Sequence, residues 1–268
     1  MTSDDVVVKR RADAPEGFFA AEAAGLAWLA QAQEAGGARV VEVLGVGPHE
    51  IRLRRVRTAA ATPSAAQALG AALAVTHAAG APAFGSLAPG SGGRAWIGPL
   101  ALPTERALAT GRAGAPGSWG PFFAALCLEP HLRAARDSSA VDADGSAVIM
   151  RVCDRLAAAD PDLTGPPEPA ARLHGDLWAG NVLWTAGGAV LIDPSAHGGH
   201  RETDLAMLDL FGAPFLDRVV AAYDARSPLA EGWRDRVGVH QLYPLLVHAV
   251  LFGAGYGAQA VAAARRYA

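Results

Sequence analysis

The sequence predicts an α+β protein in which a small, β-rich N-terminal lobe (residues 1–57) precedes a mostly helical C-terminal lobe (residues 58–268). Three observations predict this division. β-branched runs such as Val6-Val7-Val8 occur mainly before residue 57. After that point, apolar residues recur mostly at helical spacing. The chain has 268 residues and 51% of them are hydrophobic, which is enough for a large core in one bilobal domain or two small ones.

Charge and hydropathy argue against several classes of protein. The formal net charge of −3 gives no reason to expect a nucleic-acid partner, because such proteins usually carry a basic face. The N-terminal residues lack the pattern of a signal peptide, and the longest apolar stretch, residues 242–252, is too short to span a bilayer. Cys127 and Cys153 lack metal-ligand spacing, so we expect buried free thiols in a reducing compartment. A cytoplasmic protein without a membrane partner is expected, and its oligomeric state stays open.

The most informative stretch, residues 173–194, reads LHGDLWAGNVLWTAGGAVLIDP. Its pattern predicts a loop, a short strand, a glycine turn and a second strand that ends at Asp193. A hairpin of this kind can bring the carboxylates of Asp176 and Asp193 and the amide of Asn181 to the same end of a small sheet.

These residue types suit phosphoryl transfer. One carboxylate must receive the proton of the attacking hydroxyl, and oxygen ligands must hold Mg²⁺ against the phosphates. Kinase catalytic loops have the pattern H-x-D-x-x-x-x-N, followed by a metal-binding Asp after a strand, and His174, Asp176, Asn181 and Asp193 match it in order. We interpret Asp176 as the base and Asn181 and Asp193 as the metal ligands. Any one of these residues alone would be explained equally well by turn formation, and the fixed offsets of all four favour the chemistry.

At these residues the sequence resembles a known family. The segments HGDLWAGN, IDP and GHRETDLAM are similar to those of the fructosamine kinase (ketosamine-3-kinase) family. This family is a branch of the protein-kinase-like phosphotransferases, which also include aminoglycoside and choline kinases. Trp178 and the segment Gly199-His200-Arg201-Glu202 favour this branch, and the resemblance runs from about Val6 to the C-terminus.

The resemblance implies a protein-kinase-like bilobal fold. It also implies a phosphotransferase that uses ATP and Mg²⁺ to phosphorylate a sugar hydroxyl of a ketoamine, the adduct that forms when a sugar glycates an amine. The ketoamine could be a small molecule or attached to a protein, and the reaction would serve deglycation.

The N-terminal segment offers candidates for nucleotide binding. Lys9 ends the first β-branched run, and Glu22 lies in a helix predicted over residues 17–33. In kinases a strand lysine contacts the α- and β-phosphates and is held by a glutamate of the next helix. We therefore predict this role for Lys9 and Glu22, although a solvated lysine and a surface glutamate would give the same local pattern.

Two more strands are predicted, over residues 39–43 and 50–56. The resemblance places the hinge that meets adenine at Arg54-Arg55-Val56, at the end of the second strand. An exposed basic strand end is the alternative. A kinase small lobe normally has two strands and a glycine-rich turn before the lysine strand, yet only eight residues precede Lys9 and none is glycine. We expect that an upstream segment is missing, and that a chain complete without it would cover ATP poorly and have weak or no activity.

Five further residues receive roles by resemblance. His174 braces the catalytic loop, and Asp204 bonds its backbone. Trp96, Trp178 and His200 are placed near the acceptor, although Trp96 could equally anchor its loop to the core.

In the C-terminal lobe, helices are predicted over residues 62–78, 118–136 and 146–159, with Thr62 as the N-cap of the first and a bend near Pro130 in the second. Residues 79–102 form a long loop. Thr203 or Asp204 is expected to cap the helix that runs through Phe211.

Two other functions stay open. One is another small-molecule kinase, acting on an aminoglycoside, an amino alcohol or a free sugar; no dense group of carboxylates in the final helices points to a cationic acceptor. The other is a non-catalytic nucleotide-binding or scaffold protein, which the absent glycine-rich turn would fit. Retention of the base and metal residues argues against the second.

Overall fold

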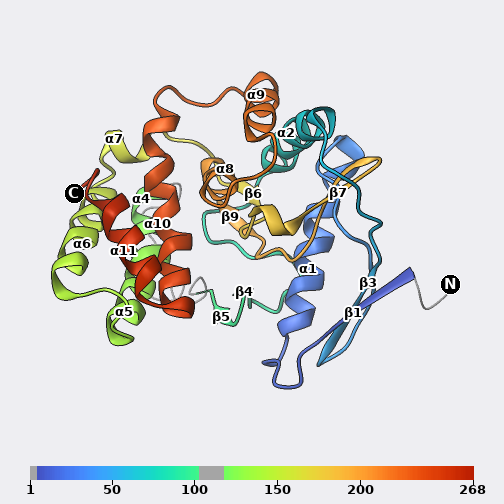
Figure 1. The fold of residues 1–268 in the computed structure, drawn as a ribbon, viewed down its shortest axis with the longest axis horizontal. Helices are drawn as coiled ribbons and strands as arrows, with labels where there is room; N and C mark the ends of the chain where they lie inside the picture. Colours follow the sequence, from blue (N-terminus) through green and yellow to red (C-terminus); the bar gives the residue numbers. More distant parts are fainter. Residues whose placement is uncertain (1–4, 103–117) are drawn as a thin grey trace. The chain divides into compact units, whose positions relative to one another are not determined.

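The computed structural model describes residues 5–102 and 118–268. The chain forms two compact units, and each is described by itself (Figure 1). The first consists of Met1–Pro82, Ser86–Leu102 and Ala171–Pro228, and the second of Ala83–Gly85, Pro103–Ala170 and Leu229–Ala268. The first unit thus holds both the N-terminal strands and the catalytic hairpin. The lobe boundary at residue 57 stays a prediction.

The elements of the first unit alternate short strands with helices. In chain order they are β1 (Val6–Arg10), α1 (Phe18–Ala30), the 3₁₀ turn η2 (Gln33–Ala35), β2 (Val43–Val46), β3 (Glu50–Arg54), α2 (Pro63–Ala78), β4 (Trp96–Ile97), β5 (Leu100–Ala101), β6 (Ala171–Leu173), the 3₁₀ turn η4 (Ala179–Asn181), β7 (Val182–Thr185), β8 (Gly188–Leu191), β9 (His197–Gly199), α8 (Arg201–Leu210) and α9 (Leu216–Arg226).

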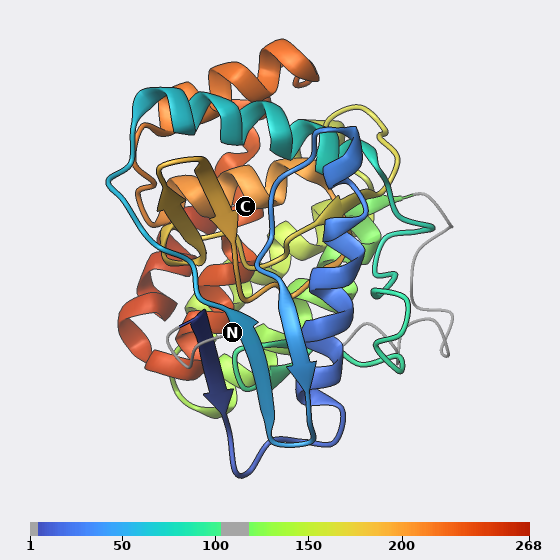
Figure 2. The same cartoon turned by 90° about the vertical axis from the view of Figure 1, so that its right-hand side faces the viewer.

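An antiparallel sheet with the strand order β1-β3-β2 carries Lys9, whose Cα pairs with that of Ile51. Alternation along β3 turns Ile51 and Leu53 toward the core. Figure 2 shows α1 running beside this sheet, and the helix contributes Phe19 and Leu26 to the same buried cluster. The helix that carries Glu22 is therefore fixed against the strand that carries Lys9.

The strand predicted over residues 39–43 is wrong, because β2 begins only at Val43. Residues 39–41 instead pair with the end of β8. The Val41 N–H donates to the Leu191 carbonyl at 3.0 Å, and the Leu191 N–H donates to the Arg39 carbonyl at 2.8 Å. A partner 150 residues away along the chain leaves no local sequence pattern. The pairing connects the segment after α1 to the catalytic hairpin.

The predicted hairpin that leads to Asp193 is confirmed. β7 and β8 pair antiparallel from Val182↔Leu191 to Thr185↔Gly188. β8 ends at Leu191, so Asp193 lies two residues beyond the strand rather than at its end. β6 pairs antiparallel with β9, with Leu173 opposite His197. This second pairing brings the segment that follows β6 alongside the segment that precedes β9.

The sequence predicts the N-cap of α2 correctly and that of α8 incorrectly. Thr62 caps α2 as predicted, since its Oγ1 accepts from the Ala65 N–H at 3.1 Å and Pro63 is the first helical residue. For α8 the predicted cap is wrong, because His200 caps it through its ring nitrogen, 3.2 Å from the Glu202 N–H. Asp204 lies within the helix, and its carboxylate accepts hydrogen bonds from the backbone N–H groups of His174 and Gly175.

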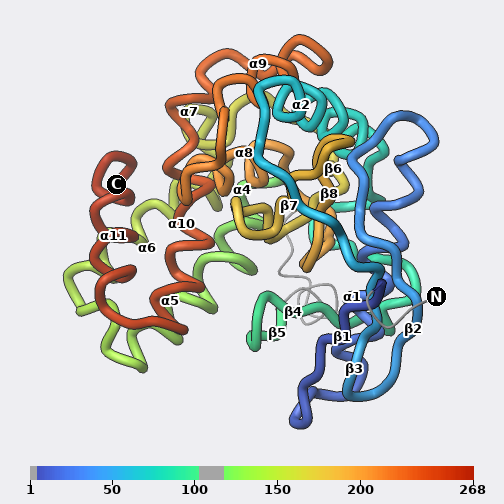
Figure 3. Tube along the Cα trace, turned by 45° about the vertical axis from the view of Figure 1, so that its right-hand side comes forward, coloured from blue at the N-terminus to red at the C-terminus, as the bar shows by residue number. Residues whose placement is uncertain are grey.

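The second unit is helical in its described residues, and Figure 3 shows α10 and α11 lying side by side. Its helices are α4 (Trp119–Phe122), the π-helical turn η3 (Phe123–Leu128), α5 (Glu129–Asp137), α6 (Ala143–Ala157), α7 (Pro161–Thr164), α10 (Trp233–Phe252) and α11 (Ala254–Ala264). The helix predicted over 118–136 is thus widened into a π turn just before Pro130, which lacks the N–H that a regular α-turn needs.

Cys127 and Cys153 are buried free thiols, as predicted. Burial raises the pKa of the Cys153 thiol to about 12, so it is protonated and unreactive at neutral pH. Among the helices of the described residues, none combines the length and apolarity needed to cross a bilayer.

Candidate active site

The predicted catalytic loop follows β6, and two residues with left-handed backbone shape this loop and the segment after β8. Gly175 has φ +79°, and a Cβ at this position would overlap the Ser195 carbonyl and the His197 ring. Asp193 has φ +55° although it carries a side chain. Left-handed residues other than glycine are uncommon and often mark functional sites. The two segments therefore pack closely and turn Asp176 and Asp193 toward one cavity.

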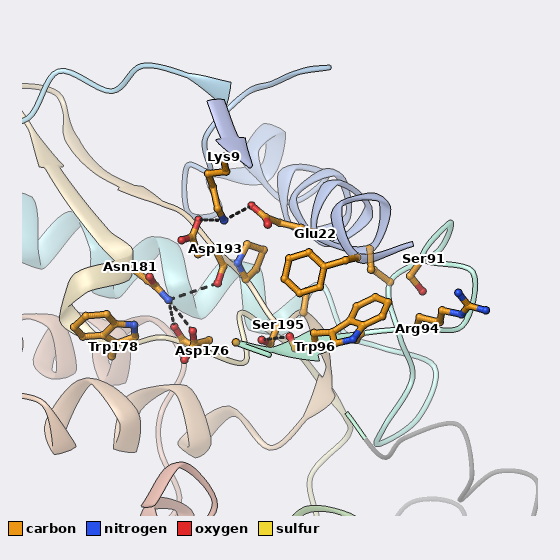
Figure 4. Close-up of a pocket in the computed structure, with 17 residues that line it drawn as sticks. Lys9, Glu22, Ser91, Arg94, Trp96, Asp176, Trp178, Asn181, Asp193 and Ser195 are labelled. Carbon is orange, nitrogen blue, oxygen red and sulfur yellow. Dashed lines mark hydrogen bonds and ion pairs between the residues drawn. The ribbon is translucent and has the colours of Figure 1, made fainter. Parts of the chain in front are cut away.

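Asp176 is held by Asn181. The Asn181 Nδ2 donates to the Asp176 backbone carbonyl at 2.7 Å and to its carboxylate Oδ2 at 3.0 Å, and it lies 3.5 Å from the Asp193 carbonyl (Figure 4). Burial raises the pKa of the Asp176 carboxyl to about 6, while the bond from Asn181 opposes the rise and the charge of Asp193 adds to it. The side chain is thus oriented, partly desolvated and poised to take up a proton near neutral pH.

Lys9, Glu22 and Asp193 form a chain of ion pairs. The Lys9 Nζ is 2.8 Å from the Glu22 carboxylate and 2.9 Å from the Asp193 carboxylate. Burial alone would lower the pKa of Lys9, but the two carboxylates outweigh it and raise the pKa above its usual value. Burial raises the pKa of Glu22 against the pull of Lys9. Glu22 is therefore not a surface glutamate, and Lys9 is not a fully solvated lysine.

His174 and Asp204 lie beneath the loop. The Asp204 carboxylate accepts from the backbone N–H groups of His174 and Gly175 at 2.7 and 3.0 Å, and it lies 3.2 Å from the His77 ring. His174 Nε2 is 2.9 Å from the Ile192 carbonyl, and its Nδ1 accepts from the Asp176 N–H at 3.3 Å. Burial would raise the pKa of Asp204, but His77, His174 and the backbone donors lower it below its usual value. Both side chains brace the loop from below.

One cavity of about 270 Å³ contains the site. Its lining includes the predicted base, the predicted metal ligands and the Lys9–Glu22 pair, together with the predicted aromatic residues Trp96 and Trp178. These are Lys9, Glu22, Trp96, Asp176, Trp178, Asn181 and Asp193. The sequence therefore predicted seven residues that the structure brings together.

The predicted hinge residues and His200 do not line this cavity. Arg54 donates to the Glu42 carboxylate at 3.0 Å, and Arg55 donates to the Val6 carbonyl at 3.2 Å. Val56 packs against the core beside the sheet. His200 is buried as the cap of α8. Their assignment to adenine and acceptor binding stays a prediction.

The sequence reasoning missed several residues of the cavity. Phe18 packs against Trp96 with ring centroids 5.4 Å apart, and Ser195 donates to the Trp96 carbonyl at 2.6 Å. Ser91 and Arg94 line the far end. Ser91, Arg94 and Trp96 all belong to the long loop before β4 or to β4 itself. Trp96 was predicted by family resemblance, whereas for Ser91 and Arg94 the length of this loop was the only signal that pointed to function.

The donor set fits a hard divalent cation. The Asn181 amide nitrogen is engaged with Asp176, so its carbonyl oxygen faces away from that bond. The Asp193 carboxylate is 37% exposed and borders the cavity. Carboxylate and amide oxygens are the ligands that Mg²⁺ prefers in proteins, usually completed by water and phosphate oxygens. Asn181 and Asp193 could therefore hold such an ion together with a bound triphosphate.

A sequence profile described as "Fructosamine kinase" matches residues 1–267. The chain belongs to the fructosamine kinase family. Members of this family are phosphotransferases that act on sugar hydroxyl groups, so the predicted family and enzyme class are confirmed.

Curated relatives agree with the fructosamine kinase family. A probable ketoamine kinase of Thermus thermophilus is 34% identical to this chain, over 93% of the chain and 82% of that protein. A probable ketoamine kinase of Enterococcus faecium is 37% identical, but the match covers only 53% of this chain and 50% of that protein. The chain thus matches about half the length of the Enterococcus relative.

Solved structures confirm the protein-kinase-like fold. A crystal structure from Thermobifida fusca, provisionally assigned as a fructosamine-3-kinase, is 44% identical, with a TM-score of 0.85 over 97% of this chain and 84% of that one. An aminoglycoside phosphotransferase in complex with gentamicin shares the fold, with a TM-score of 0.61 over 99% of this chain and 88% of that one, at 12% identity.

Proposed function

We propose that this member of the fructosamine kinase family transfers the γ-phosphoryl group of ATP to a sugar hydroxyl of a ketoamine, with Asp176 as the base. One observation carries the proposal. Asp176, Asn181 and Asp193 line the same cavity as the Lys9–Glu22 pair. Phosphoryl transfer needs a base, oxygen ligands for a metal and a cation for the phosphates in one place, and this cavity offers all three. Family membership supports the ketoamine as the acceptor.

Asp176 would orient the acceptor hydroxyl and take its proton. With a pKa of about 6, the carboxylate is mostly ionised at neutral pH and still basic enough to share a proton in the transition state. The bond from Asn181 occupies Oδ2 and leaves Oδ1 for the hydroxyl. His174 and Asp204 would act only as positioning residues, since both contact the loop backbone.

Lys9 would bind the non-transferred phosphates. Its ammonium is fixed by Glu22 at 2.8 Å, and this contact can persist when phosphate oxygens replace the carboxylate of Asp193. Asn181 and Asp193 would then hold Mg²⁺. Mg²⁺, when bound, neutralises charge on the β- and γ-phosphates. The protein itself supplies position and charge, which account for most of the catalysis in this class of reaction.

The acceptor would lie against aromatic side chains. Trp178 is 42% exposed and stands beside the base on the cavity wall, with Phe211 supporting its ring at 6.2 Å between centroids. Trp96 borders the same cavity further along. An exposed tryptophan beside a carboxylate gives a sugar an apolar surface and a hydrogen-bond acceptor together. Trp178 and Trp96 are therefore proposed as contacts for the ketoamine.

The decisive experiment measures ADP release from MgATP with a panel of acceptors. We expect activity with fructosamines or ribulosamines of simple amines, and little with aminoglycosides, choline or free sugars. The product would be a phosphorylated ketoamine, and regeneration of free amine from it would support a role in deglycation. Transfer to an aminoglycoside instead of any ketoamine would overturn the acceptor assignment. A thermal shift with MgATP but no ADP release from any acceptor would indicate a non-catalytic protein.

A further inference from the structure

We infer that Arg94 selects ketoamine acceptors that carry an anionic group distant from the phosphorylated hydroxyl. This inference rests on the proposed function and deepens it by naming the substrate class. Arg94 is not part of the kinase catalytic-loop motif, and the proposed base and metal ligands can act without it. The argument depends on where Arg94 lies in the cavity and on which charges surround it.

The cavity has two chemically different ends. Asp176 and Asn181 lie at one end, and Ser91 and Arg94 lie at the other, with Trp96 between them (Figure 4). A volume of about 270 Å³ is near the lower limit for small-molecule sites. It has room for one sugar-sized group, and a substituent of that group could reach toward Arg94.

Arg94 is anchored but incompletely neutralised. Its Nη1 donates to the Glu16 backbone carbonyl at 2.7 Å, and its aliphatic Cδ lies 3.7 Å from the site of a Cβ on Gly17. The Glu16 carboxylate is 3.4 Å from the same Nη1 but is 90% exposed. An exposed ion pair of this kind is worth little. Both contacts use Nη1, so among the described residues the Nη2 and Nε donors of this half-exposed guanidinium keep their capacity to bind a ligand that extends past Trp96.

Lys9 cannot bind the anionic group of the acceptor in place of Arg94. Its ammonium is within 3 Å of both Glu22 and Asp193, and the proposed function assigns it to the phosphates of ATP. The anionic group of an acceptor placed there would also meet the carboxylates of Asp176 and Asp193. Like charges at such distances repel. An anion on the acceptor is therefore favoured at Arg94 and disfavoured near the base.

Two kinds of acceptor would satisfy this arrangement. The anion could be the carboxylate of an amino acid whose amine is glycated, or a phosphate on the sugar. A guanidinium can bind either group with two parallel hydrogen bonds. Trp96 and Phe18, with ring centroids 5.4 Å apart, would pack against the linker between the hydroxyl and the anion. Both kinds of acceptor carry an anionic group that an apolar linker separates from the phosphorylated hydroxyl.

The test compares kcat/KM for three ketoamines: a glycated amino acid, its uncharged amide, and a ketoamine with a phosphorylated sugar. We expect the wild-type protein to prefer one or both anionic acceptors over the amide. Arg94→Gln should reduce the ratio of kcat/KM for the anionic acceptor to kcat/KM for the amide by about tenfold, the size of a charge-assisted hydrogen bond at a half-exposed site. Glu16→Gln, which removes the competing carboxylate, should increase the preference. Arg133→Gln, on an exposed helix of the second unit, is the matched control.

Each outcome has a distinct meaning. Loss confined to the glycated amino acid or to the phosphorylated sugar identifies which anion Arg94 binds. Equal kcat/KM for all three acceptors, or a preference that survives Arg94→Gln, would overturn the inference and leave the proposed function standing. Absence of turnover with every ketoamine would instead refute the proposed function. Because the amide serves as an internal reference, a folding defect in the variant would lower all three rates together and be recognised.

Discussion

The ammonium of Lys9 lies 2.9 Å from the carboxylate of Asp193, although the two residues are 184 positions apart. This contact joins the first strand of the N-terminal sheet to the segment after the catalytic hairpin. Both side chains are about one-third exposed and border the same cavity. The cavity is lined by three carboxylates, those of Glu22, Asp176 and Asp193, and the Lys9 ammonium lies within 3 Å of two of them and offsets part of their charge.

Asp193→Ala should weaken the binding of MgATP by at least tenfold, since it removes the proposed metal ligand. Lys9 keeps its bond to Glu22, so the fold should be retained. Titration of nucleotide affinity against Mg²⁺ concentration tests this. Asp217→Ala, at an exposed carboxylate, is the control. An unchanged Mg²⁺ dependence in Asp193→Ala would remove this residue from the metal site.

Asp176→Asn should reduce kcat by two or more orders of magnitude, which is typical of the loss of a general base. Affinity for nucleotide should change little, because the side chain contacts Asn181 rather than Lys9. Single-turnover kinetics and equilibrium nucleotide binding separate the two effects. A variant with near wild-type turnover would show that another group accepts the proton.

The pH dependence of kcat/KM should have an acidic limb near pH 6, because the pKa of Asp176 is raised to about 6 and the base must be ionised. The same shift gives a stability prediction. A carboxyl whose pKa is higher in the folded than in the unfolded state destabilises the fold once it ionises. Asp176→Asn should therefore raise Tm at pH 7.5, and the gain should vanish below about pH 4, where both states are protonated. A gain that is independent of pH would contradict this origin.

Asp204→Asn should lower the free energy of unfolding of the first unit by about 3 kcal/mol. The two carboxylate oxygens of Asp204 accept bonds from two backbone N–H groups, and an amide would place an NH₂ donor against one of these N–H groups. The pKa of Asp204 is lowered in the fold, so its stabilisation is present above pH 4 and is lost as pH falls below that. Urea unfolding at pH 7 and at pH 3 measures both values. Asp217→Asn, at an exposed position of α9 in the same unit, should change the free energy of unfolding little.

Gly70→Ala should destabilise the first unit by about 2–3 kcal/mol. A Cβ at Gly70 would overlap the backbone carbonyl of Val219, so α2 and α9 would have to separate. Gly255→Ala is the contrast, since a Cβ there meets nothing within 4 Å and alanine favours the helix by up to about 1 kcal/mol. Thermal unfolding should move in opposite directions for the two variants. Equal shifts would show that the α2–α9 contact is looser than the structure indicates.

The sequence by itself determined which residues form the centre of the proposed active site. Asp176, Asn181 and Asp193 were found because they lie within one short stretch, where spacing and a hairpin pattern are enough to place side chains together. Lys9 and Glu22 were found for a similar reason, since a strand and the next helix are neighbours in the chain. The Thr62 cap was also readable, because capping depends on only a few adjacent residues.

Only the tertiary structure decided the features that depend on distant partners. Residues 39–41 pair with Leu191 instead of forming their own strand. His200 caps α8, and the carboxylate of Asp204 bonds the backbone of the loop after β6 instead of capping that helix. Arg94 became part of the cavity through a long loop whose path has no local periodicity. Local spacing fixes which groups a segment offers, but the packing of remote segments decides which of them share a site.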